Sequence, residues 1–271
     1  MIEFRSVSKT FADGTAAVRD FNLVLPSHTT TVFVGSSGCG KTTLLRMVNR
    51  LVEPSSGQVL IDDVDVATRH PVELRRSIGY VMQHAGLLPH RRVLDNVAVP
   101  LRLSGVSRAE AAARALAALE TVGLDPVLAR RYPRQLSGGQ QQRVGVARGL
   151  VADPNILLMD EPFGAVDPIV RDDLQRELLR LQRELGKTIV FVTHDVDEAF
   201  LLGDQVVILR KGGQIAQAGT PAEILADPAD DFVRSFVGLD RARRTLHIEE
   251  RAGRQVVVDG DGRPAGVLDP A

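Results

Sequence analysis

The nine residues GSSGCGKTT, at positions 35–43, constrain the fold of this chain more than any other stretch. They follow the short apolar run 31–34 and precede residues 44–48, whose apolar side chains have helical spacing. The stretch therefore lies where a strand turns into a helix, which is the context of a phosphate-binding loop. The alternative is a glycine-rich turn that merely starts a helix.

We interpret this stretch as a loop whose backbone holds an anion. Gly35 and Gly40 would let the backbone curl so that successive N–H groups point inward, and the positive end of the following helix adds to the attraction. Lys41 is expected to reach the β- and γ-phosphates of a nucleotide, and the Thr42 hydroxyl to bind Mg²⁺. Cys39 either fills space or, with a lowered pKa, is a site where oxidation blocks nucleotide entry.

Composition narrows the class of protein. Of the 271 residues 44% are hydrophobic and 25% are charged, which is typical of a globular chain and excludes a disordered one. The net charge of −1 gives no indication of a nucleic-acid partner. No apolar run reaches the roughly 20 residues that span a bilayer, and a single cysteine leaves no internal disulfide, so we expect a cytosolic protein.

Strand-like and helical segments alternate along most of the chain. Strands are predicted over residues 2–4, 17–25, 31–34, 57–62, 78–83, 156–159, 188–193, 205–210 and 213–219. Helices are predicted over 44–48, 93–103, 107–122, 144–151, 169–185 and 195–202, and again from 221 to about 237. Residues from about 93 to 152 therefore form a helical block inserted into an α/β protein, with Ser107 as an expected N-cap.

Acidic side chains follow the apolar strand 156–159. Such a buried parallel strand ends at the sheet edge where open α/β folds place their ligands. Asp160 is expected to hold Mg²⁺ through water, and Glu161 to polarise an attacking water. His194 ends the strand 188–193 at the same edge, where it could donate to the γ-phosphate or have only a structural role.

Three other features allow two interpretations each. Phe11, in the turn 9–14, is either a platform for an adenine ring or a satellite core residue. Gln83, at a strand end, either binds Mg²⁺ or its water, or is simply solvated. Residues 136–143 (LSGGQQQR) either offer a second set of free N–H groups to an anion or only start a helix capped by Ser137.

These features, taken in order, resemble the nucleotide-binding subunit of ATP-binding cassette (ABC) transporters over residues 1 to about 240. The resemblance implies a P-loop NTPase (RecA-like) α/β core with an N-terminal antiparallel β subdomain and an inserted α-helical subdomain. It also implies that ATP and Mg²⁺ are the ligands. The adenine ring would stack on Phe11, and Gln83 would join Thr42 and Asp160 at the metal. The catalytic residues would be Lys41, Glu161 and His194. The expected phosphate-binding residues are Gly35, Ser36, Ser37, Gly38, Cys39, Gly40, Lys41, Thr42 and Thr43.

The family resemblance also implies a partner chain. In the family, two subunits stack head to tail, and the signature residues of one subunit close over the ATP held by the other. The signature here comprises Ser137, Gly138, Gly139 and Gln140. Since the chain carries one set of motifs, a homodimer or a pair with a similar ATPase subunit is expected, with residues 164–167 crossing the dimer axis. Integral membrane permease subunits would dock at the Gln83 loop and the helical block, on the cytoplasmic side of the membrane, and a solute-binding protein would act indirectly.

The stretches 82–90, 93–97 and 161–169 look like those of importers of glycine betaine, choline, carnitine and related osmoprotectants. The tail, residues 241–271, supports this because residues 256–268 are similar to one hairpin of a cystathionine-β-synthase-type (CBS) domain, of which it resembles a fragment. Other importers, of polyamines, sugars, anions or amino acids, are the alternative.

Other classes of phosphate-loop protein fit less well. Cassette ATPases that act in DNA repair or on ribosomes usually have a coiled-coil insert, tandem cassettes or a basic linker. The helical block and the extra C-terminal segment after about residue 220 fit an importer better than an exporter subunit. A phosphate-loop kinase would lack the 136–140 signature. No nucleic-acid partner is expected.

Overall fold

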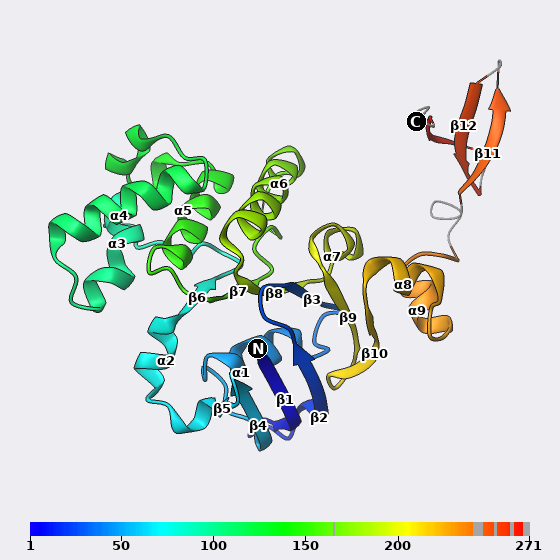
Figure 1. Cartoon of the computed structure of the whole chain (residues 1–271), viewed down its shortest axis with the longest axis horizontal. Coiled ribbons are helices and arrows are strands. Elements are labelled where there is room, and N and C mark those ends of the chain that lie inside the picture. Colours follow the sequence, from blue (N-terminus) through cyan, green and yellow to red (C-terminus); the bar gives the residue numbers. More distant parts are fainter. Residues whose placement is uncertain (165, 241–245, 252–253, 261–262, 268–271) are drawn as a thin grey trace.

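A six-stranded sheet runs through the centre of the computed structural model, which describes residues 1–164, 166–240, 246–251, 254–260 and 263–267 (Figure 1). Its order is β10-β9-β3-β8-β7-β6, and only β10 is antiparallel to its neighbour. The strands are β3 (Thr30–Gly35), β6 (Ile78–Val81), β7 (Ile156–Asp160), β8 (Thr188–Thr193), β9 (Gln205–Arg210) and β10 (Gln214–Gly219). The predicted α/β fold class is confirmed.

Both faces of this sheet are covered, which explains why its strands are continuous apolar runs. In β3, Val32 and Val34 belong to one hydrophobic cluster while Phe33, between them, belongs to the other. In β8, Phe191 and Val192 divide in the same way. The two clusters are therefore separate cores on opposite faces of one sheet.

One core lies between the central sheet and an antiparallel sheet of order β2-β1-β4-β5. These strands are β1 (Ile2–Thr10), β2 (Ala16–Leu25), β4 (Ser56–Ile61) and β5 (Val64–Asp65). Helix α1 (Lys41–Val48) contacts strands of both sheets, and Phe4, Phe21 and Phe33 pack beside it with ring centroids 5.2 to 6.4 Å apart. This packing fixes the helix that follows the predicted phosphate loop.

The inserted helical block stands to one side of the central sheet, in green in Figure 1. It contains α3 (Val93–Leu103), α4 (Arg108–Thr121), α5 (Gly138–Leu150) and the 3₁₀ turns η2 (Pro126–Arg130) and η3 (Pro133–Gln135). The Ser107 hydroxyl accepts a hydrogen bond from the Glu110 N–H at 3.2 Å, so the predicted cap is confirmed. The predicted start of α5 at residue 144 is wrong, because the helix begins at Gly138.

The remaining helices complete the core. They are α6 (Pro168–Leu185), α7 (Val196–Leu202), α8 (Pro221–Ala226) and α9 (Asp231–Phe236), together with α2 (Pro71–Ser77) and the 3₁₀ turn η1 (Val66–Thr68), which the sequence pattern did not indicate. Within the described residues, no helix has both the length and the apolar character needed to cross a bilayer.

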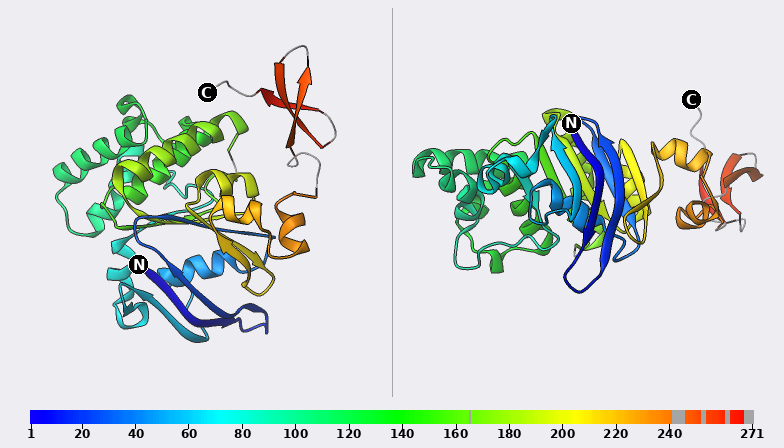
Figure 2. Two further views of the ribbon diagram at one scale, coloured as in Figure 1. Left: turned by 45° about the vertical axis from the view of Figure 1, so that its right-hand side comes forward. Right: turned by 90° about the horizontal axis from the view of Figure 1, so that it is seen from below.

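The C-terminal segment forms a small antiparallel sheet of order β11-β12-β13, beyond α8 and α9 in Figure 2. Its strands are β11 (Leu246–Arg251), β12 (Arg254–Asp259) and β13 (Pro264–Val267). The predicted hairpin corresponds to β12 and β13, whereas β11 was not expected. Residues 241–244, at the predicted boundary between the two parts of the chain, and Leu268 lie outside the described residues, and the resemblance to a CBS fragment stays a prediction.

Candidate functional site

The predicted phosphate loop joins the end of β3 to the start of α1. Gly38 and Gly40 have φ angles of 75° and 113°, so the backbone curls at these two glycines. Gly35 was expected to provide such a turn, and that expectation is wrong because its φ is not positive. Gly35 is needed for space: a Cβ there would lie 2.5 Å from the Leu209 carbonyl oxygen and 2.9 Å from Cys39 Sγ.

The loop presents unpaired backbone donors, and its residues 36–38 are exposed. The N–H groups of Ser37, Gly38 and Gly40 have no hydrogen-bond partner within the described chain. These groups precede the N-terminus of α1, where the helix dipole favours an anion. The loop therefore has the donors that a phosphate group requires.

Lys41 supplies a positive charge at the base of this loop. Its side chain is 4% exposed, and Nζ donates to the Gly35 and Ser36 carbonyl oxygens at 2.7 and 3.1 Å. No carboxylate pairs with it among the described residues. Since a buried ammonium is costly without an opposite charge, this position favours an anionic ligand. Cys39 is buried beside it with Sγ 3.9 Å from Nζ, as a residue that fills space would be.

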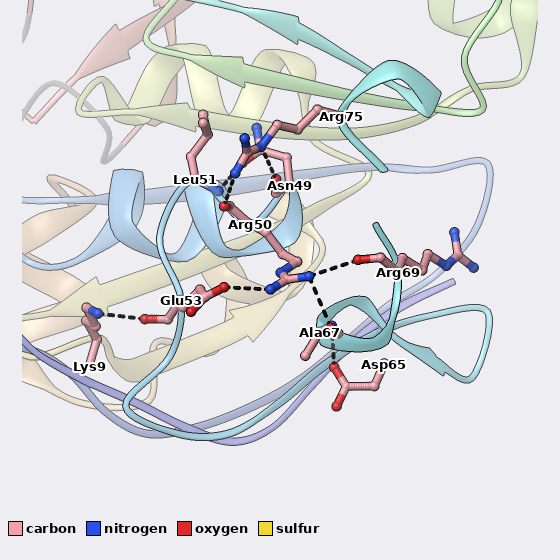
Figure 3. A network of polar contacts seen from close by, with 9 residues as sticks. All are labelled: Lys9, Asn49, Arg50, Leu51, Glu53, Asp65, Ala67, Arg69 and Arg75. Carbon is pink, nitrogen blue, oxygen red and sulfur yellow. Dashed lines mark hydrogen bonds and ion pairs between the residues drawn. The ribbon is translucent and has the colours of Figure 1, made fainter. Parts of the chain in front are cut away.

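The far end of α1 is fixed by a separate network (Figure 3). The Arg75 guanidinium donates to the Asn49 and Arg50 carbonyl oxygens, which follow the helix, at 3.2 and 2.5 Å. The Arg50 guanidinium donates to the Ala67 carbonyl oxygen and pairs with Glu53 at 2.6 Å. Arg75 is a cation at the negative end of α1 and satisfies two carbonyl groups that directly follow the helix, while Arg50 ties this end to the segment around residue 67. The network therefore holds α1 in place from the end opposite the loop.

Asp160 ends β7 next to α1 and is bonded through both carboxylate oxygens. Oδ1 accepts from the Thr42 hydroxyl at 2.8 Å, and Oδ2 accepts from Arg46 Nη2 at 3.2 Å and from the Tyr80 hydroxyl at 3.1 Å. Burial raises the pKa of Tyr80, so its hydroxyl stays protonated and donates. Neither Arg46 nor Tyr80 was expected at the site, because no local pattern links residues so distant in sequence.

The residues predicted to bind Mg²⁺ offer oxygen ligands. Thr42 and Asp160 are in contact. Gln83 lies near Glu161 at the same edge, since a Cβ built on Gly164 would lie 3.7 Å from Gln83 Nε2 and 3.8 Å from Glu161 Oε2. Hydroxyl, carboxylate and amide oxygens suit Mg²⁺, which usually takes few protein ligands and completes its shell with phosphate oxygens and water. Within the described residues, no cluster of three His, Cys, Asp or Glu side chains could hold a metal by itself.

Glu161 and His194 form a pair at the same edge of the sheet. Glu161 Oε2 and His194 Nδ1 are 3.0 Å apart, and the His194 side chain is 61% exposed. The Glu161 backbone has a φ of 45°, and its N–H donates to the Val192 carbonyl oxygen at 2.9 Å. This strained conformation is typical of functional positions and aims the carboxylate out of the strand.

The signature residues lie at the N-terminus of α5. The Ser137 hydroxyl accepts from the Gln140 N–H at 3.3 Å, and Gln140 Oε1 accepts from the Ser137 N–H at 3.0 Å. At Gly139, a Cβ would lie 2.2 Å from Val170 Cγ1. No hydrogen bond joins these residues to the loop 35–43, and α5 packs mainly on α3, α4 and β6 (Figure 1). One chain therefore leaves its two candidate anion sites apart.

Phe11 lies in the turn between β1 and β2. Its side chain is 40% exposed and belongs to neither hydrophobic cluster, which excludes the satellite-core interpretation. Lys9 Nζ lies 5.3 Å from the ring centroid. An exposed ring of this kind is free to stack on a flat ligand.

Comparison with known proteins agrees with this geometry. The family model described as "ABC transporter" matches residues 18–164. The carnitine transport ATP-binding protein OpuCA of Listeria monocytogenes is 50% identical over 241 residues, which are 89% of this chain and 60% of the relative. The glycine betaine uptake system ATP-binding protein YehX of Escherichia coli is 49% identical over 238 residues, covering 88% of this chain and 77% of the relative.

A solved dimeric structure of a post-hydrolysis state of an ATP-binding cassette, bound to ADP and Pi, is also similar. It has a TM-score of 0.74 and 35% sequence identity, and the match covers 82% of this chain and 99% of the other. The chain spans about three fifths of the length of the OpuCA protein that it matches. The family model and these identities together establish that the chain belongs to the ABC transporter family.

Proposed function

We propose that this chain is the ATP-binding and hydrolysing subunit of an importer for a quaternary-amine osmoprotectant such as glycine betaine, choline or carnitine. One observation carries the proposal. Over nearly nine tenths of its length, the chain is about half identical in sequence to ATP-binding proteins named for carnitine and glycine betaine transport. Such an importer would couple ATP turnover to solute uptake.

ATP would bind along the loop 35–43. The free N–H groups of residues 37, 38 and 40 would donate to phosphate oxygens, and Lys41 would exchange its carbonyl partners for the β- and γ-phosphates. The exposed Phe11 ring would stack on the adenine.

Hydrolysis would use the carboxylates at the end of β7. Glu161 would accept a proton from the attacking water, and His194, now in contact with Glu161, would instead donate to the γ-phosphate. Thr42, Asp160 and Gln83 would hold Mg²⁺, which neutralises charge on the phosphate oxygens when bound. Arg46 and Tyr80 would keep Asp160 in the required orientation.

A second copy of this chain, or a similar ATPase subunit, would complete each site. The Ser137–Gln140 segment lies apart from the loop of its own chain, so its free helix end would serve the ATP of the other copy, head to tail. The exposed Ser137 and Gly138 are accessible for this contact. Residues 164–167 would cross between the two copies.

Membrane partners would use a different face. Permease subunits would dock where the loop after β6, which carries Gln83, meets the helical block, so the protein would be peripheral on the cytoplasmic side of the membrane. Arg148, on α5, donates to the Ala85 and Gly86 carbonyl oxygens and so links that loop to the helical block. A solute-binding protein would act through the permease.

Reconstituted transport tests the proposal. The chain would be purified from a membrane extract together with its integral membrane partners, reconstituted with the solute-binding protein, and assayed for ATP-dependent uptake of glycine betaine, choline and carnitine, with a sugar and a polyamine as controls. Uptake of a quaternary amine that stops in Glu161→Gln is expected. Uptake of only the sugar or polyamine would contradict the solute assignment, and the absence of any membrane partner would contradict the transport function.

A further inference from the structure

A cavity of about 610 Å³ opens on the helical block, away from the loop 35–43. Residues before and along α3, the first turns of α4, the end of η2 and Tyr132 line it. Asp95 is the only carboxylate in this lining. Five of the lining residues are arginines, namely Arg91, Arg92, Arg102, Arg108 and Arg130. Leu94 and three alanines supply an apolar part of the lining.

The positive charge of this cavity is not balanced by the protein. Elsewhere arginines pair with carboxylates, as Arg50 does with Glu53 and Arg180 with Glu177. None of the five cavity arginines forms an ion pair in the described part of the chain, and Arg102 donates only to the Val106 carbonyl oxygen. Asp95, in the same lining, is not ion-paired there either.

Arginine side chains do not lose their proton in proteins. The guanidinium groups therefore stay charged and attract an anion. Their planar donors match phosphate oxygens in pairs, which makes clustered arginines suitable for a phosphate of several charges. The volume is within the range of small-molecule sites.

We propose that this cavity binds a small soluble anion with several phosphate charges, about the size of a nucleotide, at a site separate from the phosphate loop. The apolar part of the lining and Tyr132 would contact the rest of the ligand. Tyr132 is followed directly by η3 and then by Ser137. A ligand that ties η2 to α3 would therefore restrain the segment that leads to the signature residues, and so modulate the proposed function.

Calorimetric titration with inorganic tripolyphosphate, without Mg²⁺, tests the site. In Lys41→Ala, which disables the phosphate loop, we expect one saturable binding event to remain. The double variant Arg92→Glu/Arg108→Glu should weaken this binding roughly tenfold or more, because it reverses two of the charges. Arg183→Glu is the matched control, since Arg183 is exposed on α6 and has no ion pair in the part of the chain that is described.

The outcomes separate this site from the ATP site. ATP binding that persists in Arg92→Glu/Arg108→Glu while tripolyphosphate binding is lost supports the cavity. Equal affinities in the double variant and in Arg183→Glu would overturn it, as would the loss of all saturable binding in Lys41→Ala. If Lys41→Ala does not fold, the wild type saturated with ADP replaces it, with the same expectation. Sedimentation with phosphatidylglycerol vesicles, without any tripolyphosphate binding, would overturn the soluble ligand in favour of a membrane surface.

Discussion

Tyr80→Phe removes one hydroxyl from the site and leaves the ring in place. The hydroxyl donates to Asp160 Oδ2 at 3.1 Å, and the Asp160 side chain is only 9% exposed. A hydrogen bond to a charged group contributes about 1.5–3 kcal/mol. Because Tyr80 is only half-buried and Thr42 and Arg46 still reach Asp160, we expect the lower part of this range. The free energy of unfolding should fall by about 1–2 kcal/mol.

Urea denaturation of the purified chain measures this loss. Tyr132→Phe is the matched control, since Tyr132 is the only other tyrosine and its hydroxyl has no hydrogen-bond partner among the described residues. Combined with Asp160→Asn, Tyr80→Phe should show a coupling energy of about 1 kcal/mol. A stability equal to that of Tyr132→Phe, or additive effects in the double variant, would show that the contact does not orient Asp160.

Three further predictions concern the loop, a buried acid and the signature. Gly35→Ala should lower the free energy of unfolding by about 2–3 kcal/mol, because the new Cβ would lie 2.5 Å from the Leu209 carbonyl oxygen. Gly38→Ala should lower it by about 1 kcal/mol, because there is space for a Cβ but the φ of 75° strains an alanine. Equal shifts in melting temperature for the two variants would contradict this distinction. Burial raises the pKa of the Glu198 carboxyl above its ordinary value of 4.5, so the folded chain binds this proton more tightly than the unfolded chain does. The bound proton therefore stabilises the fold at acid pH. This stabilisation is lost as the pH rises from 4.5 through the raised pKa. Glu198→Gln should remove this dependence of stability on pH, which amounts to about 1.4 kcal/mol for each unit by which the pKa is raised. The prediction is refuted by identical profiles of unfolding free energy against pH for the variant and the wild type. Ser137→Arg should leave ATP binding by the single chain unchanged but prevent formation of the nucleotide-dependent dimer. Sedimentation with a non-hydrolysable ATP analogue measures the dimer. A dimer as stable as that of the wild type would refute the proposed role of Ser137.

Local patterns predicted most elements well. The helix 93–103 has the predicted bounds, and Ser107 forms the predicted cap because its side chain accepts a hydrogen bond from the N–H three residues on. The strand ending at Asp160 was evident because four apolar residues bounded by turn residues suit a buried parallel strand.

The differences have physical causes. The range predicted for α5, 144–151, begins six residues too late, although a helix start capped by Ser137 was one of the two interpretations of residues 136–143. The reciprocal bonds of Ser137 and Gln140 and the packing of Gly139 against Val170 stabilise the helix from Gly138 onward. The contacts of Arg46 and Tyr80 with Asp160 depend on strand order in the sheet, which a local pattern does not carry. The role of Gly35 depends on the carbonyl oxygen of Leu209, on a neighbouring strand.

Sedimentation of Glu161→Gln with ATP and Mg²⁺ tests the central claim most directly, namely that two copies complete each other's ATP sites. Without the carboxylate that we propose as the general base, bound ATP should persist and hold two chains together. A species of twice the 29.4 kDa chain mass is expected with ATP, and the single-chain mass without it. A variant that binds ATP but keeps the single-chain mass, or that hydrolyses ATP at the wild-type rate, would contradict the account.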